Sequence, residues 1–385
     1  MSGARDGYLD KGKPIRIGVL MDVPERHYRF AFPIYDFVCD HYAGSGRFHR
    51  GIELVKKTVF GPPAGYIDDV MRGYHELCDE GVLAVIGPNH SDNNIAITDH
   101  AEARKVPVMT LGAIHTHLSP HVFNVGWGSV PEDSYTVASW LDQHDHRRVT
   151  LTFDNAAHCL IYAHWFRVAA RQAGIEIVAE HCVSEINDDF AIEDMKRTLE
   201  AHRAKNPDAI VCFGTGASQL NWGRVVHASG WDVPRIMNGA FFQANYAYTH
   251  EFFDGWVGTG LWDDDNRTMQ ALRRQFAEAR PDLADVAPEI LGLYRDGMMA
   301  LLEGIAAAPI LTPKGVTQGL ENVRMVPAAI GGNRTTLSFG PYDHKGHKGM
   351  DMMVIRRLTQ GRLIMEGRFE PFGTKRAPQA AAPVA

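Results

Sequence analysis

Five short apolar runs, each followed by a glycine or polar turn and then by a helix-like stretch, constrain the fold of this chain most strongly. The runs cover residues 14–22, 82–88, 106–113, 148–154 and 208–216, and a shorter sixth run covers 234–237. They do not alternate in polarity, which is typical of strands that are buried on both faces of a parallel sheet. The sequence therefore predicts an α/β fold in which helices cover both faces of doubly wound sheets.

Stretches with helical periodicity separate these runs. They lie at 68–80, 95–105, 134–144, 161–174, 192–205, 219–230 and 289–306. Gly81, Gly174 and Gly230 each stand just after a helix, where a left-handed residue commonly caps it. The strand–helix units form two series, so we expect two lobes joined by three glycine-containing or extended crossings near Gly126, Gly258 and Thr336. The expected lobes are 14–126 plus 261–336 and 127–260 plus 337–372, with flexible ends at 1–13 and 373–385.

The composition excludes several classes of protein. The 385 residues carry a formal net charge of -7, and the basic residues are scattered, so nucleic acid is not an expected partner. No segment approaches 18 uninterrupted apolar residues, and no apolar segment precedes the first strand, so we expect neither membrane insertion nor a signal peptide. Five cysteines without paired spacing favour a reducing compartment. We expect a cytoplasmic protein, or a periplasmic or cell-surface one if a leader has been removed.

Several segments, taken in order, resemble one protein family. They are IRIGVLMD, LCDEGVLAVIGPNHS, KVPVMTLGA, NPDAIVCFGTGA, SGWDVPRIMNGAFF, ILGLYRDGMMALLEGI and the closing hairpin that begins LSFGPYDHKG. Their order and spacing are similar to the type I periplasmic binding proteins of the leucine/isoleucine/valine group, which includes cytosolic amide-sensing members. The resemblance implies two lobes, joined by three crossings, that close by hinge motion on a small molecule in a cleft between facing strand ends. The implied partners are that small molecule and either an ABC permease or a regulatory protein. Formation of a homodimer is a further alternative.

Ligands of parallel sheets bind beyond the carboxyl ends of the strands, so the residues after each run form the candidate site. Ser91 is the strongest candidate, because a hydroxyl at a helix start lies beside unbonded backbone N–H groups. By resemblance, Ser91 matches the position that hydrogen-bonds the ligand carboxylate in the amino-acid binders. The alternative is that Ser91 only caps its own helix. The other expected ligand-binding residues are His90, Gly112, Ala113, Ile114, His115, Ala157, His158, Thr215, Gly216, Gly239, Ala240 and Phe241.

The resemblance also suggests a class of ligand. The hydroxyl position of the amino-acid binders matches Ile114 here, and the acidic residue that holds the ligand ammonium would fall near Gly239 or Ala240, where no Asp or Glu occurs. A buried ammonium without a carboxylate is costly. We therefore expect a neutral or anionic ligand, such as an amide, a carboxylate or an aromatic acid, unless Asp154 or Glu185 supplies the charge. Aromatic residues near the expected site would suit an apolar part of the ligand. The alternative is that each of them serves core or interface packing: Tyr28, Phe30, Trp127, Phe241 and Phe242.

Histidines at the strand ends raise the question of a metal site. His90, His115, His117 and His158 lie there, but a metal needs at least three convergent ligands, and only Asp154 adds to these histidines. We expect no metal and no other cofactor, and we expect the histidines to donate hydrogen bonds to an anionic ligand or to carbonyl groups.

Catalysis has no positive signature in the sequence. Gly214 and Gly216 form a GxG after a strand, but Gln219 stands where a dinucleotide site needs its third glycine. His90 and Ser91 are adjacent, but no GxSxG elbow surrounds them. We expect no catalytic residues and a non-catalytic binding protein, either the solute receptor of an ABC importer or a cytosolic ligand sensor. The alternative is an enzyme that has recycled the binding cleft for hydrolytic chemistry.

Overall fold

The computed structural model describes residues 12–22, 25–48, 50–62, 65–186, 188–245 and 250–368. The expected flexible ends, apart from Gly12 and Lys13, lie outside the described residues, and so does the side chain of Tyr28. The chain divides into two compact units. Unit 1 comprises Met1–Val130, Asn155–Ile161 and Gly260–Val354, and unit 2 comprises Pro131–Asp154, Tyr162–Thr259 and Ile355–Ala385.

The third crossing differs from the expected one. The chain last passes between units after Val354 rather than near Thr336. The reason is that the segment after Thr336 is tied to unit 1 by backbone pairing. Strand β12 (Thr336–Leu337) pairs antiparallel with β11 (Val326–Pro327), and Lys345 forms a parallel bridge with Asn124. Residues 337–354 are therefore assigned to unit 1.

Unit 1 is built on a five-stranded sheet whose neighbouring strands are all parallel. The strand order is β2-β1-β3-β4-β5. The strands are β1 (Ile15–Met21), β2 (Ile52–Thr58), β3 (Val85–Ile86), β4 (Val108–Thr110) and β5 (Val122–Asn124). Three of them, β1, β3 and β4, fall within predicted apolar runs and are almost completely buried, which confirms that prediction.

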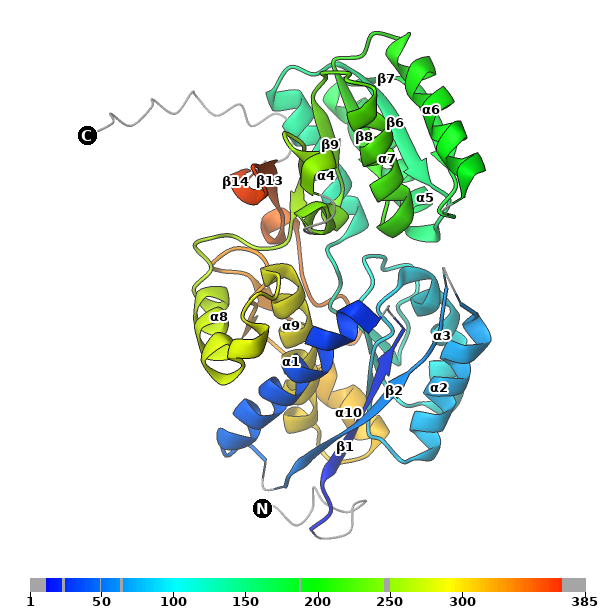
Figure 1. The fold of residues 1–385 in the computed structure, drawn as a ribbon. Helices are drawn as coiled ribbons and strands as arrows, with labels where there is room; N and C mark the ends of the chain where they lie inside the picture. The colour runs from blue at the N-terminus through cyan, green and yellow to red at the C-terminus, as the bar shows by residue number, and fades with distance from the viewer. Residues whose placement is uncertain are drawn as a thin grey trace, which may run out of the picture. The chain divides into compact units, whose positions relative to one another are not determined.

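Helices cover this sheet in two groups (Figure 1). Helices α2 (Ile67–Asp79) and α3 (Ser91–Arg104) pack together on one side, while α9 (Pro288–Ala307) packs against both α1 (Glu25–Gly44) and α10 (Pro313–Leu320). Leu20, Tyr74 and Ile97 are fully buried in the core that α2 and α3 share with the sheet. Unit 1 is completed by α8 (Arg267–Ala279) and the 3₁₀ turns η3 (Pro281–Leu283) and η4 (Met350–Met352).

Unit 2 is built on a larger sheet with the order β14-β13-β10-β9-β8-β6-β7. The strands are β6 (Arg148–Asp154), β7 (Glu176–Val183), β8 (Ala209–Phe213), β9 (Arg235–Met237), β10 (Val257–Gly260), β13 (Val354–Thr359) and β14 (Arg362–Gly367). The pairs from β7 through β6, β8 and β9 to β10 are parallel, and β13 and β14 form an antiparallel hairpin. The prediction of an α/β protein with mostly parallel sheets is confirmed.

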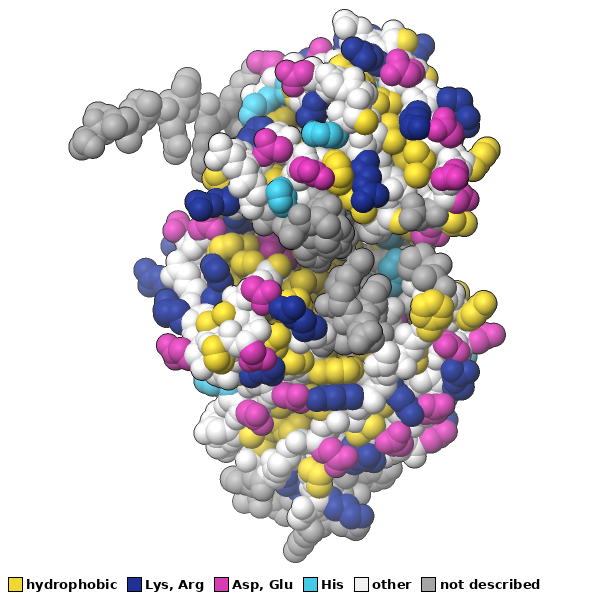
Figure 2. Space-filling view, in the orientation of Figure 1, with side chains coloured by type: hydrophobic (Ala, Val, Ile, Leu, Met, Phe, Trp, Pro, Cys, Tyr) yellow, Lys and Arg dark blue, Asp and Glu magenta, His cyan; other side chains and the backbone are white. Residues whose placement is uncertain are grey.

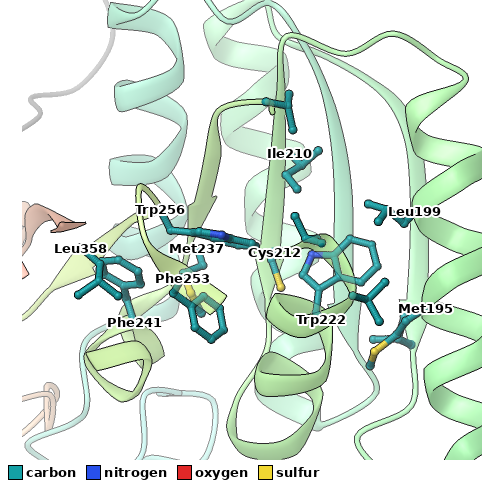
Figure 3. Close-up of a cluster of buried hydrophobic side chains, with 14 residues drawn as sticks. Met195, Leu199, Ile210, Cys212, Trp222, Met237, Phe241, Phe253, Trp256 and Leu358 are labelled. Atoms are coloured by element: carbon teal, nitrogen blue, oxygen red, sulfur yellow. The ribbon is translucent and has the colours of Figure 1, made fainter. Parts of the chain in front are cut away.

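The core of unit 2 is rich in aromatic residues. Helices α6 (Asp189–Arg203) and α7 (Gly216–Ala228) pack together on the sheet, and Trp222 of α7 points into a cluster that includes Cys212, Phe253 and Trp256 (Figure 3). The remaining elements are α4 (Val130–Gln143), α5 (Ala157–Ala173), η1 (Gly239–Asn245) and η2 (His250–Phe253). The first residues of α5, up to Ile161, belong to unit 1. Gly81, Gly174 and Gly230 have positive φ angles after their helices, as the capping argument predicts.

The described surface carries charges of both signs. In Figure 2, basic and acidic side chains are interspersed over the face in view. This mixture matches the scattered basic residues of the sequence and gives that face no single-sign patch. None of the helices in the described part of the chain has the length and apolar character needed to cross a membrane.

Candidate functional site

The strand order of unit 1 reverses between β1 and β3, because β2 lies on one side of β1 and the later strands follow on the other. In open parallel sheets, ligands bind beyond the carboxyl ends of the two strands at such a reversal. Asp22 follows β1 and residues 87–90 follow β3, so these two loops lie at the reversal point. The candidate site of unit 1 is built from them.

The loop after β3 is shaped by Gly87. Its φ angle of +98° lies in the region that favours glycine, and a Cβ at this position would approach the Leu20 carbonyl oxygen to 2.1 Å. The Gly87 N–H donates to the Met109 carbonyl at 2.8 Å, and the Gly87–Pro88 peptide bond is cis. The chain then enters α3 with His90 as the N-cap residue.

A buried carboxylate holds the start of α3 in place. One oxygen of Asp22 accepts from the Asn89 backbone N–H at 2.7 Å and from Asn89 Nδ2 at 3.1 Å. The other oxygen accepts from the His90 backbone N–H at 3.1 Å and from Asn93 Nδ2 at 2.6 Å. Asp22 thus fixes the helix start from the neighbouring strand. Sequence reasoning did not select it, although it is the last residue of the first apolar run.

The Ser91 hydroxyl does not cap its helix. Ser91 is the first helical residue, is only 5% exposed, and makes no side-chain hydrogen bond within the described part of the chain. The first helical hydrogen bond runs from the Asn94 N–H to the His90 carbonyl at 3.0 Å. The N–H groups that precede Asn94 in the helix have no acceptor within it. A hydroxyl and a helix start therefore present donors together, an arrangement that suits a carboxylate or carbonyl oxygen.

Gly112, two residues beyond the end of β4, makes room for this arrangement. A Cβ on Gly112 would lie 2.9 Å from Ser91 Oγ and 2.1 Å from the side-chain amide of Asn94. We assign the Asn94 amide with its nitrogen toward the carbonyl oxygens of Pro88 and His90, so that its oxygen accepts from the Gly112 N–H at 2.8 Å. The Gly112 carbonyl accepts from Asn124 Nδ2 at 2.9 Å. The backbone of Gly112 is therefore hydrogen-bonded within unit 1.

The residues that follow Gly112 are mostly turned inward. The Ala113 carbonyl accepts from the Val130 N–H at 3.2 Å, and Ile114 is 1% exposed. His115 Nδ1 lies 3.5 Å from Ser129 Oγ. Burial, together with the nearby Lys345 ammonium, holds the pKa of His115 well below its usual range, so this imidazole is neutral near pH 7.

His117 is a structural histidine. Its Nε2 lies 2.9 Å from Thr110 Oγ1, and burial lowers its pKa to about 4. It is therefore neutral near pH 7, like His115. Its contact with Thr110 ties the loop that follows β4 to the last residue of that strand.

The expected residues of unit 2 gather around a second helix start. Thr215 is the N-cap residue of α7, and its N–H donates to Asp154 Oδ2 at 3.3 Å. Ser218 Oγ donates to the same oxygen at 2.5 Å. The Gly216 N–H donates to Gln243 Oε1 at 3.2 Å, which joins the helix start to η1. Asp154, considered above as a metal ligand or ammonium partner, thus binds α7.

The η1 segment is anchored by a carboxylate that sequence reasoning missed. The Gly239 N–H donates to Asp133 Oδ2 at 2.9 Å, and the Tyr162 hydroxyl donates to the same oxygen at 2.6 Å. Thr259 Oγ1 donates to Asp133 Oδ1. Burial raises the pKa of Asp133 to about 6, although these hydrogen bonds act in the opposite direction. No local pattern could have identified Asp133, because its partners are distant in sequence.

Ala240 and Phe241 are integrated into the interior of unit 2. The Ala240 carbonyl lies 3.4 Å from Gln219 Nε2, and both residues are buried. The Phe241 ring belongs to the aromatic core cluster, where it lies with Met237 and Leu358 (Figure 3). Its side chain therefore serves packing.

The remaining expected residues, Ala157 and His158, begin α5 in the segment that belongs to unit 1. The Ala157 N–H donates to Asp92 Oδ1 at 3.2 Å. His158 is 5% exposed, and its ring centroid lies 5.7 Å from that of His90 in an edge-to-face arrangement. His90, Asp92 and His158 bring ligand-type atoms within 4.8 Å of one another. Asp92 was not selected from the sequence, and only its place beside Ser91 could have indicated it.

Comparison with known proteins decides the family. A family model described as periplasmic binding protein matches residues 63–361 of the sequence, which is most of the chain. The chain belongs to the periplasmic binding protein family. The resemblance inferred from the sequence motifs is thereby confirmed. No curated protein sequence matches the chain significantly.

Solved structures share the fold of this periplasmic binding protein at low sequence identity. A type 1 periplasmic binding protein from Bordetella pertussis Tohama I is similar with a TM-score of 0.78 at 16% identity, over 92% of this chain and 100% of that one. A leucine binding protein from Thermotoga maritima MSB8 gives 0.74 at 18% identity, over 93% and 99%. An R. palustris ABC-transporter solute binding protein in complex with benzoate gives 0.73 at 16% identity, over 93% and 97%.

Proposed function

We propose that this chain is a solute-binding protein that holds an oxygen of a small organic molecule at the start of α3. The observation that carries the proposal is the buried Ser91 hydroxyl, which has no hydrogen-bond acceptor within the described residues and lies beside the first-turn N–H groups of the helix. Asp22 fixes this helix start at the strand reversal of unit 1. A preorganised set of donors in such a position suits an anion or a carbonyl group.

We favour a carboxylic acid without an ammonium group as the ligand. No acidic residue stands at Gly239 or Ala240, and the nearby Asp133 carboxylate accepts hydrogen bonds from Tyr162 and Gly239. Asp154, which could supply a charge instead, accepts from Thr215 and Ser218. Among the solved structures of this fold, one holds benzoate, a carboxylate that lacks an ammonium. Leucine carries both a carboxylate and an ammonium group, so it is the comparison ligand.

The biological role that we propose is that of a receptor which delivers its solute to an ABC permease. Family membership supports this role, and so does the description of the R. palustris protein as part of an ABC transporter. Closure by hinge motion and the residues of unit 2 that complete the site stay predictions. We propose no catalytic step, because binding alone accounts for the donors at α3.

A thermal-shift screen tests the proposal. The metal-free protein in EDTA is heated with benzoate, 4-hydroxybenzoate, benzamide or leucine. A ligand at about a hundred times its Kd stabilises the folded state by about 2.7 kcal/mol, which raises the Tm by a few degrees in a chain of this length. We expect the acids to give the largest shifts. A large shift with leucine and none with the acids would contradict the ligand class, and no shift with any small acid, amide or amino acid would contradict solute binding.

A further inference from the structure

Two helix starts of unit 1 bring two imidazoles and one carboxylate together. His90 is the N-cap residue of α3, Asp92 lies in its first turn, and His158 lies in the first turn of α5. Their ligand-type atoms all lie within 4.8 Å of one another. We propose that His90, Asp92 and His158 form a binding site for a divalent transition metal ion of the zinc class.

The distances agree with a metal site. Ligands that surround zinc tetrahedrally at about 2.1 Å lie about 3.4 Å from one another. His90 Nδ1 and Asp92 Oδ2 are already 3.5 Å apart. The ligand-type atom of His158 lies within 4.8 Å of the other two. Two imidazoles with one carboxylate form a donor set that suits zinc and similar ions. Calcium and magnesium instead favour sites made of oxygen ligands.

Neighbouring hydrogen bonds orient the ligands. The Ala157 N–H donates to Asp92 Oδ1, which leaves Oδ2 directed toward His90. The backbone N–H of His90 is held by Asp22 at 3.1 Å. Supporting contacts of this kind fix the geometry of metal ligands and strengthen binding. Three protein ligands leave at least one coordination position for water or for an oxygen of a bound molecule.

The burial and charge of the cluster fit this assignment. His158 is 5% exposed, whereas the side chains of His90 and Asp92 are 19% and 23% exposed, so an ion can enter from solvent. The helix dipoles of α3 and α5 place partial positive charge at this point, which disfavours binding of a cation. The charge of Asp92 offsets this effect, so replacement of this carboxylate by an amide should weaken binding strongly.

The test uses zinc alone with the untagged full chain. The protein is freed of metal with EDTA, returned to buffer without chelator, and titrated with zinc chloride by calorimetry, and the bound metal is counted by elemental analysis. Asp92→Asn and His158→Ala remove ligands. His164→Ala is the matched control, because His164 is exposed on the same helix, α5. Cobalt chloride is added in parallel, since bound cobalt absorbs visible light in a manner that depends on its ligands.

We expect one zinc ion per chain in the wild type and in His164→Ala. Each ligand variant should bind zinc more than about 100-fold more weakly, a loss larger than that caused by removing a supporting partner. Unchanged melting of the metal-free variants shows that they fold, and Asp92→Asn, which keeps its shape, decides the question if His158→Ala does not fold. The proposal is overturned if the wild type binds no zinc at micromolar concentration, or if the ligand variants bind like His164→Ala.

The metal site and the solute site are tested separately. They share His90 and His158 as expected ligand-binding residues, but the zinc titration contains no organic ligand and the solute screen contains EDTA. Failure of one therefore leaves the other standing.

Discussion

The Asp22 carboxylate accepts two hydrogen bonds from Asn89, one from its backbone N–H at 2.7 Å and one from its side-chain Nδ2 at 3.1 Å. The two residues follow adjacent parallel strands, β1 and β3, so this contact ties together the loops at the strand reversal. The position of α3, and with it Ser91, depends on this link.

Asp22→Asn should destabilise unit 1. The amide keeps one acceptor oxygen but turns an NH₂ group toward N–H donors, and hydrogen bonds to a charged acceptor contribute about 1.5 to 3 kcal/mol each. We expect a loss of at least about 2 kcal/mol in the free energy of unfolding by urea. Asp36→Asn is the control, because Asp36 pairs with Lys56 on the surface, where such pairs contribute little. Equal stability of the two variants would contradict the role given to Asp22.

Gly112→Ala should weaken both stability and solute binding. The added methyl group would lie 2.1 Å from the side-chain amide of Asn94 and 2.9 Å from Ser91 Oγ, so both side chains must move. We expect a loss of about 1 to 3 kcal/mol in stability, as in other overpacked sites, and at least about tenfold weaker binding of the best acid in the screen. Gly51→Ala, whose new methyl group would meet nothing within 4 Å, should leave both unchanged. Wild-type affinity in Gly112→Ala would show that Ser91 is not held at a binding site.

Asp133→Asn should change how stability depends on pH. The folded pKa of about 6 is above the ordinary carboxyl value, so the contribution of Asp133 is fully present below pH 4 and is lost as the pH rises through 6. A difference of about two pKa units corresponds to about 3 kcal/mol. The asparagine can accept from Tyr162 and Gly239 and donate to Thr259 Oγ1. We therefore expect the variant to gain stability relative to the wild type by about this amount between pH 4 and pH 7.

The measurement is urea unfolding of both proteins across that pH range. His117 and His202, whose pKa values burial lowers to about 4, oppose the effect in the wild type, because their contribution is lost as the pH falls from 6.5 through 4. They are present in both proteins and cancel in the difference. A difference that stays constant with pH would show that Asp133 is not a buried carboxyl with a raised pKa.

The strands that the sequence predicted correctly are those buried on both faces. The run at 14–22 became β1 and the run at 208–216 became β8, whose residues are all buried. By contrast, β2 and β7 lie at the edges of their sheets, and nearly all of their residues are half-buried or exposed, so they contain no continuous apolar run. Helix α1 was not predicted, because Pro33 lies inside it and proline usually interrupts a helix.

The candidate site was predictable only where its residues adjoin a predicted strand. Ser91 could be selected because it follows β3 at a helix start. The network of Asp133 joins residues from distant parts of the chain, and the approach of His158 to Asp92 likewise depends on tertiary packing. The third crossing was misplaced because an extended, glycine-rich segment gives no local signal of the partner with which it pairs.

The central claim is that the Ser91 hydroxyl binds a ligand oxygen, and calorimetry of Ser91→Ala tests it most directly. The acid that gives the largest thermal shift is titrated into the wild type, Ser91→Ala and Ser229→Ala, the last of which removes a hydroxyl that donates to Val226 at the end of α7. We predict that Ser91→Ala melts like the wild type and binds about 2- to 150-fold more weakly, which corresponds to about 0.5 to 3 kcal/mol, while Ser229→Ala keeps full affinity. Unchanged affinity in a normally folded Ser91→Ala would contradict the claim.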